Sequence, residues 1–116
     1  MSSIKRVAVG KRMSEMTVYN GVAYLAGQVA ADASQDAAGQ TRQVLAAIDK
    51  LLAEAGTDKT RILRAQIFLA DIGDFAAMNS VWDTWVVAGE TPARATVEAK
   101  LAAPEYKVEI MVTAAV

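Results

Sequence analysis

The sequence predicts an α+β fold in which two helices cover one face of a six-stranded sheet. Six short runs have the composition or the alternation of apolar and polar residues that is typical of strands, and two longer segments repeat apolar residues at helical spacing. These segments follow one another in the order βββαβαββ. Each helix has a single apolar stripe, so both helices are expected to pack on one face of the sheet.

The length and composition predict one folded domain. The chain has 116 residues, of which 53% are hydrophobic and 22% are charged, a balance typical of globular proteins. Repeats, low-complexity stretches and long linkers are absent from the sequence. We therefore expect residues 1–116 to form a single domain with one core.

A β-hairpin is expected near the N-terminus. Residues 4–9 form a strand-like run, and two further runs, 16–19 and 22–26, flank Asn20-Gly21. Asn and Gly tolerate positive φ, which the two-residue type I′ turn of a hairpin requires.

Two helices are expected from the apolar spacing. The first covers about residues 37–55 and ends before Gly56, whereas the second begins after Asp74 and ends before Gly89. The Asp74 carboxylate is a good N-cap, because it can accept a hydrogen bond from an unpaired backbone N–H. The apolar stripes of the two helices are Val44, Leu45, Ile48, Leu51, Leu52 and Ala55, and Phe75, Met78, Val81, Trp82, Trp85 and Val86.

The other strands carry the polar residues of greatest interest. In residues 62–70 the apolar side is expected to consist of Leu63, Ala65, Ile67 and Leu69. In the last two strands, alternation separates Arg94, Thr96, Glu98 and Lys100 from Ala95, Val97, Ala99 and Leu101, and separates Glu109 from Val108, Ile110, Val112, Ala114 and Val116. Arg94 and Glu109 are therefore both predicted to turn away from the apolar core.

The sheet face without helices is expected to be partly polar. It would carry Arg94, Thr96, Glu109, Arg64 and Gln66, with Phe68 and Met111 among them. Such a face is either solvated or covered, and we expect another subunit to cover it.

Several classes of function are disfavoured by composition. With no His and no Cys, thiolate metal sites and Cys nucleophiles are excluded, and we expect no metal and no cofactor. The 12 basic and 13 acidic residues nearly cancel, which disfavours nucleic-acid binding. No stretch has the length of a membrane span or a signal-peptide core, so we expect a cytoplasmic protein with no membrane partner.

Five short segments stand in the order and spacing of the RidA/YjgF family. They are Ala26-Gly27-Gln28, Phe68–Asp71, Asp74–Asn79, Pro92-Ala93-Arg94 and Lys107–Ile110. The resemblance covers nearly the whole chain, and Asp74–Gly89 together with Pro104–Ile110 is most similar to the YoaB-like branch. It implies a chorismate-mutase-like fold with a six-stranded mixed sheet, and a homotrimer with clefts between subunits.

The resemblance also implies an activity and its residues. Archetypal members hydrolyse reactive enamines and imines to 2-keto acids and ammonia. By this resemblance Arg94 would bind the substrate carboxylate, helped by a backbone group near Thr96, and Glu109 would be associated with the reacting water. Gly27 would line the cleft, and Asn79 matches the helix asparagine of the family motif. These roles suit the chemistry of a guanidinium, which binds carboxylates through two parallel hydrogen bonds, and of a glutamate, which moves protons.

One departure from the family affects the choice of function. Met13 occupies the position of a family tyrosine, so an aromatic hydroxyl near the substrate is missing. This favours the alternative that the protein only binds small carboxylates such as 2-keto acids. A third alternative, an endoribonuclease, is disfavoured by the acidic pI of about 5.3 and the absence of His.

Arg94 and Glu109 could each have a simpler, structural role. Arg94 would be a solvated cation or part of a structural ion pair, and Glu109 would form a cross-strand pair with Lys100. If the last two strands formed a hairpin, Arg94 and Glu109 would lie roughly 13–20 Å apart along it, too far for one small substrate. Both residues then serve one site only if the last strand pairs elsewhere or if one residue comes from a neighbouring subunit.

Overall fold

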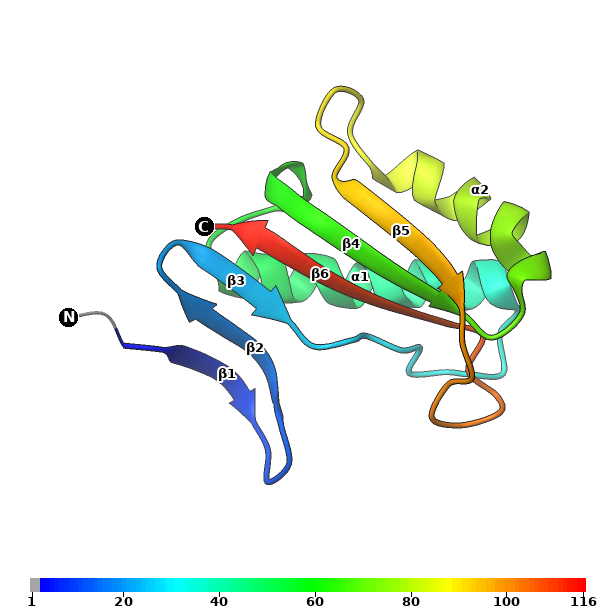
Figure 1. The fold of residues 1–116 in the computed structure, drawn as a ribbon, viewed down its shortest axis with the longest axis horizontal. Coiled ribbons are helices and arrows are strands. Elements are labelled where there is room, and N and C mark those ends of the chain that lie inside the picture. Colours follow the sequence, from blue (N-terminus) through cyan, green and yellow to red (C-terminus); the bar gives the residue numbers. More distant parts are fainter. Residues whose placement is uncertain (1–2) are drawn as a thin grey trace.

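The computed structural model describes residues 3–116 and shows one curved sheet with both helices on the same face (Figure 1). The order of elements is the predicted βββαβαββ, so the predicted fold class is confirmed. The strands and helices are β1 (Lys5–Val9), β2 (Ser14–Tyr19), β3 (Val22–Leu25), α1 (Ala37–Glu54), β4 (Ile62–Leu69), α2 (Phe75–Trp85), β5 (Ala93–Glu98) and β6 (Val108–Ala115), with 3-10 turns at Lys59–Arg61 and Ile72–Asp74.

The last strand lies in the middle of the sheet. The strand order is β1-β2-β3-β6-β4-β5, in which β4 and β5 are parallel and all other neighbours are antiparallel. A parallel pair needs a crossover connection, which α2 supplies between β4 and β5. The connection after β5 then passes the C-terminal end of β4, so that β6 pairs with β3 and β4 (Figure 1). A simple hairpin of β5 and β6 does not form.

The predicted hairpin turn is confirmed. Asn20 and Gly21 both have positive φ, at 50° and 77°, and Tyr19 pairs with Val22 across the turn. Positive φ at both central residues matches the type I′ turn that the sequence predicts.

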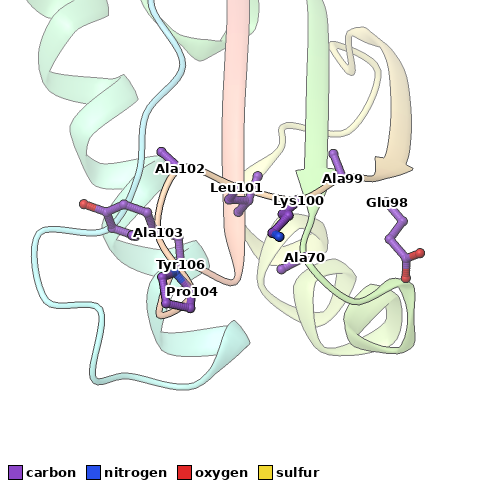
Figure 2. Close-up of a pocket in the computed structure, with 9 residues that line it drawn as sticks. All are labelled: Ala70, Glu98, Ala99, Lys100, Leu101, Ala102, Ala103, Pro104 and Tyr106. Atoms are coloured by element: carbon purple, nitrogen blue, oxygen red, sulfur yellow. The ribbon is translucent and has the colours of Figure 1, made fainter.

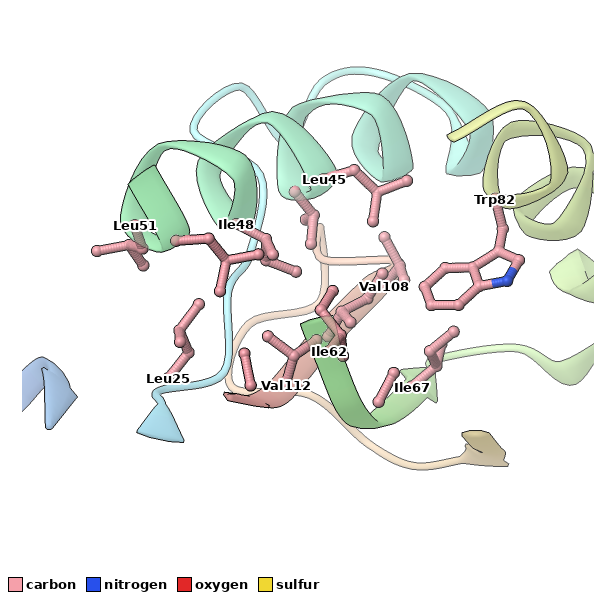
Figure 3. Packing of buried hydrophobic residues seen from close by; sticks show 14 of the residues in the cluster. Leu25, Leu45, Ile48, Leu51, Ile62, Ile67, Trp82, Val108 and Val112 are labelled. Atoms are coloured by element: carbon pink, nitrogen blue, oxygen red, sulfur yellow. The ribbon is translucent and has the colours of Figure 1, made fainter. Parts of the chain in front are cut away.

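The core fills the space between the sheet and the two helices (Figure 3). Both apolar stripes contribute to it, and so does the helix-facing side of every central strand. Burial of these side chains is the main stabilising contribution to the fold. The fully buried core residues include Met16, Val44, Ile48, Leu52, Ala65, Ile67, Leu69, Met78, Val108, Ile110 and Val112.

The buried side chain of Gln40 joins three segments near the start of α1. Its Nε2 lies 3.0–3.1 Å from the carbonyl oxygens of Ala33, Gln35 and Glu105, and its Oε1 accepts a 2.9 Å hydrogen bond from the backbone N–H of Lys107. Gln40 is fully buried, and all four of these hydrogen bonds satisfy its side-chain amide inside the protein. The amide thereby fixes the segment before α1 and the connection that leads into β6.

Four local predictions are corrected. Leu63 is exposed and Ile62 is buried instead, because the pairing of β4 with β6 shifts register between Ile62 and Arg64. Asp74 makes no capping hydrogen bond, since a 3-10 turn precedes α2 and Asp71 accepts from Gly73 N–H there at 2.8 Å. The second helix ends at Trp85, earlier than the end just before Gly89 that the sequence predicts. β5 ends at Glu98, so Lys100 and Leu101 lie beyond the strand in which they were expected.

Within residues 3–116, no helix is both long and apolar enough to cross a membrane.

Candidate functional site

Arg94 is held against one face of α2. Its Nη1 donates a 2.8 Å hydrogen bond to Oδ1 of Asn79, and its Cζ lies 5.2 Å from the ring centroid of Trp82 and 5.8 Å from that of Phe75. These hydrogen-bonding and ring partners are neutral. The guanidinium is half-buried, so it is neither a freely solvated cation nor, through these partners, one half of an ion pair.

The prediction that Arg94 and Thr96 turn away from the helices is wrong. In the parallel pairing of β4 with β5, Arg94 lies beside Ala65 and Thr96 beside Ile67, and both of these β4 residues are fully buried under the helices. Residues paired side by side share a sheet face, so Arg94 and Thr96 point to the helix side. Polar residues are tolerated there because β5 is the edge strand, where the helix layer ends.

Thr96 adds two polar groups beside Arg94. Because the N–H of Ala99 donates to Leu69 O of β4, the alternation of the strand directs the N–H of Thr96 to the free edge of the sheet. The Thr96 hydroxyl is buried and has no hydrogen-bond partner within residues 3–116. Arg94, Asn79 and Thr96 are called the arginine half-site below.

Glu109 and Gly27 meet on the opposite face of the sheet. Glu109 alternates with the buried Val108 and Ile110 of β6 and therefore turns to the face without helices, as predicted. Its carboxylate occupies the space above Gly27, where an added Cβ would lie 2.9 Å from the Glu109 Cδ. An isolated bridge between Gln28 and Ile110 brings these segments together. Glu109 and Gly27 are called the glutamate half-site.

The two half-sites of one chain do not face each other. Arg94 pairs with Ala65 and Glu109 with Phe68, so they are three residues apart along β4 and lie on either side of it. Standard strand dimensions place their Cα atoms roughly 14 Å apart. Their side chains also point to opposite faces, so the central position of β6 does not bring both onto one small molecule within a single chain.

The proposed cross-strand pair of Glu109 with Lys100 is wrong. The neighbours of β6 are β3 and β4, and the residue opposite Glu109 is Phe68. Lys100 lies beyond the end of β5, in the connection to β6.

A hollow lies beside this connection and contains none of the predicted site residues (Figure 2). Its volume is about 720 Å³, and it is lined by residues 98–104 together with Ala70 and Tyr106. Met13 also lies elsewhere, half-exposed in the connection between β1 and β2 at the other end of the strand order.

Phe75 and Trp82 were not predicted to contact Arg94. Both were assigned to the apolar stripe of the second helix, and only Trp82 is buried. Phe75, Asn79 and Trp82 are separated by four and three residues, the spacing that places side chains on one helix face. That spacing around Asn79 is the signal that would have identified both rings.

Two surface carboxyls have lowered pKa values, and both lie in loops away from these residues. Hydrogen bonds from the hydroxyl and N–H of Ser34 lower the pKa of Asp32, and those from Thr60 lower the pKa of Asp58. Hydrogen bonds to the ionised form favour it, so the stabilisation is present above the ordinary pKa and is lost as the pH falls.

The chain is similar to known proteins over almost its full length. Residues 3–116 match the family model described as Endoribonuclease L-PSP. A "RutC family protein" of Haemophilus ducreyi is 53% identical over 97% of both chains, and "RutC family protein YoaB" of Escherichia coli is 48% identical over 98% of this chain and 99% of its own. A solved structure described as a member of the YjgF protein family, from Neisseria meningitidis, has 51% identity and a TM-score of 0.95, covering 97% of this chain and 94% of its own.

Proposed function

Because this chain belongs to the YjgF (endoribonuclease L-PSP, RutC) family, as its resemblance to the RidA/YjgF family and its YoaB-like branch indicated, we propose that it hydrolyses reactive 2-imino and 2-enamino acids to 2-keto acids and ammonia. Family membership by itself supports a small-molecule deaminase or binder. The specific substrate class is our proposal. We further propose that residues 1–116 act as a single domain that needs no cofactor.

The observation that carries this proposal is the environment of Arg94. Its guanidinium is fixed by Asn79 and two rings, none of which neutralises its charge. Asn79 uses one of the five N–H donors, so a full edge remains for a planar carboxylate. The N–H of Thr96 points to the free edge of the sheet on the same strand and supplies a further donor.

The chemistry asks for a positioned water and a proton carrier. Water adds its oxygen to the carbon of the C=N bond, protons pass to the nitrogen, and the C–N bond breaks to release ammonia and leave a C=O group. In this proposal Glu109 accepts a proton from the water and returns protons to the nitrogen, while Arg94 holds the carboxylate.

Both half-sites serve one substrate if they come from neighbouring copies of the chain. The arginine half-site lies on the helix side at the free edge of β5, and the glutamate half-site lies on the sheet face without helices. That face also exposes Tyr24, Val97 and Met111, which a second copy would cover. We therefore propose sites between subunits, in the homotrimer that the resemblance to the RidA/YjgF family implies.

The trimer predicts a mass three times the 12.3 kDa of the chain. Light scattering coupled to gel filtration at micromolar concentration should give this mass, and Met111→Lys should lower it, because a charge would enter the apolar contact. A stable wild-type monomer would contradict the proposal that the site is formed between subunits.

The deaminase is tested by a coupled assay. An amino-acid oxidase generates the imine, and formation of the keto acid is followed with and without the protein. Glu109→Gln should lower kcat on the order of 100-fold while leaving keto-acid affinity nearly unchanged, since general acid–base groups contribute about 10²–10⁴-fold. If wild type does not accelerate keto-acid formation from any of several amino acids, the protein is not this enzyme.

Gly27→Ala is expected to reduce activity without unfolding the protein. The added methyl group would take the space of the Glu109 carboxylate, which is the far end of a flexible side chain and can move aside. We expect kcat to fall as in Glu109→Gln and the melting temperature to change little. The control is Ala26→Ser, which adds one small group at the residue next to Gly27. Gly56→Ala is unsuitable, because Gly56 has positive φ and the substitution would strain the backbone. Full activity in Gly27→Ala would contradict a catalytic role for the Glu109 carboxylate at this position.

A second candidate is a binder of 2-keto acids without catalysis. The presence of Met13, in place of the family tyrosine, favours it, because one hydroxyl near the substrate is missing. It predicts keto-acid binding that depends on Arg94 and no acceleration in the coupled assay. Ribonuclease activity is disfavoured despite the description of the family model, given the pI of about 5.3 and the absence of His.

A further inference from the structure

We propose that Phe75 and Trp82 are positioning residues for Arg94: the two rings hold the guanidinium so that its free edge is ready for a carboxylate before the ligand arrives. This inference rests on the proposed carboxylate-binding role of Arg94. It adds two aromatic residues that do not themselves react.

The three α2 residues around the guanidinium form one contiguous surface. Phe75, Asn79 and Trp82 lie on one side of α2, and each has a direct interaction with Arg94. The interactions differ in kind. The amide of Asn79 binds one N–H group at 2.8 Å, whereas each ring attracts the cation electrostatically through its π face at 5.2 or 5.8 Å.

Rings suit this task better than a carboxylate would. A carboxylate partner would neutralise the charge and occupy two donors in the plane of the guanidinium. A ring attracts the same cation without accepting its in-plane hydrogen bonds, so the edge that matches a carboxylate stays free. A free arginine side chain loses much rotamer freedom on binding, and holding it in place beforehand removes part of that cost.

The ring of Trp82 is held in place by the residues that pack around it. It is buried, and its ring centroid lies 5.4 Å from that of Trp85. The Trp85 Nε1 donates a 3.0 Å hydrogen bond to Asp49 of α1, and Lys59 lies over the Trp85 ring. Phe75 is the exposed member of the pair, so it can be changed without opening the core.

The test compares ring removal with ring retention. Phe75→Leu should weaken binding of 2-oxobutanoate about two- to fivefold, and Trp82→Leu about tenfold. The free energies of exposed and desolvated cation–π contacts set the upper limits of these losses, because the contacts are already present before the ligand binds. Phe75→Tyr and Trp82→Phe keep a ring and should bind almost as wild type does. In the coupled assay the leucine variants should raise KM more than they lower kcat.

Val81→Ala is the control for a loosened helix. It removes buried volume from the same helix, but Val81 lies toward Arg42 and Leu45 of α1 and not toward Arg94. We expect its affinity to stay within about threefold of wild type, below the loss that a desolvated cation–π contact produces. Equal losses in Val81→Ala and Trp82→Leu would show that a loosened helix causes the effect, and would overturn the positioning role.

A second measurement needs no ligand. In the free protein, the Arg94 Nε–H resonance should show a ring-current shift and slow rotation of the guanidinium, and Phe75→Leu should reduce both. An unshifted, freely rotating Arg94 in wild type would overturn the positioning role. If instead these signatures are present and no keto acid binds, the proposed function fails while the aromatic positioning stands.

Discussion

Replacing Arg94 with alanine is expected to weaken the binding of a 2-keto acid by at least about 100-fold, because hydrogen bonds to charged groups contribute about 1.5–3 kcal/mol each and two of them would be lost. Since the same contact would hold the imine, kcat/KM should fall at least as far. Calorimetric titration with 2-oxobutanoate and the coupled assay measure the two quantities.

Two further variants test whether the loss of keto-acid affinity is specific to the guanidinium of Arg94. Arg94→Lys keeps the charge but cannot present two parallel donors, so it should recover only part of the affinity. Arg42→Ala removes an exposed arginine from α1 and should bind as wild type does. Unchanged affinity in Arg94→Ala would eliminate both the deaminase and the keto-acid binder. The fold should survive in each variant, because Arg94 is only half-buried.

Replacing Gln40 with leucine is expected to lower the free energy of unfolding by about 3 kcal/mol or more. The change leaves three part-buried carbonyl oxygens and the part-buried N–H of Lys107 without the fully buried side-chain amide that binds them. Each buried polar group left unpaired costs about 1–3 kcal/mol. For a domain of this size the melting temperature should fall by roughly 10–20 °C.

Gln43→Leu is the matched control for this effect. Gln43 lies one turn further along α1 and also binds backbone groups, those of Asp32, but at the surface, where water can replace it. We expect a loss of less than about 1 kcal/mol. Equal melting temperatures for the two variants would contradict a structural role for the buried amide. Thermal unfolding followed by circular dichroism decides between them.

Gln40 was also missed by the sequence analysis, for a physical reason. Glutamine is common in the first turns of helices. The residues next to Gln40 in the sequence give no indication of which backbone groups its side chain binds. Those partners come from residues 33–35 and 105–107, and only the packing of the two connections around α1 brings them together.

The strands, helices and N-terminal turn were predictable because they depend on local patterns. Alternation and helical spacing identified every strand and both helices, and Asn20-Gly21 specified its turn through φ alone. The wrong predictions concern positions where strand pairing over a long sequence distance overrides the local alternation of apolar and polar residues. Leu63 was placed inward by strict alternation, which a register shift opposite β6 interrupts.

By itself, the sequence determined the elements, their order and the two polar strand positions that deserve testing, since these depend on spacing along the chain. It did not determine on which face Arg94 lies. Alternation separates Arg94 and Thr96 from Ala95 and Val97, but it cannot say which of these two sides meets the helices. The parallel register with β4, in which Arg94 lies beside the buried Ala65, decides that. Only the tertiary structure therefore placed Arg94 among the α2 rings and Glu109 on the opposite face above Gly27, because both placements depend on pairing between segments far apart in the chain.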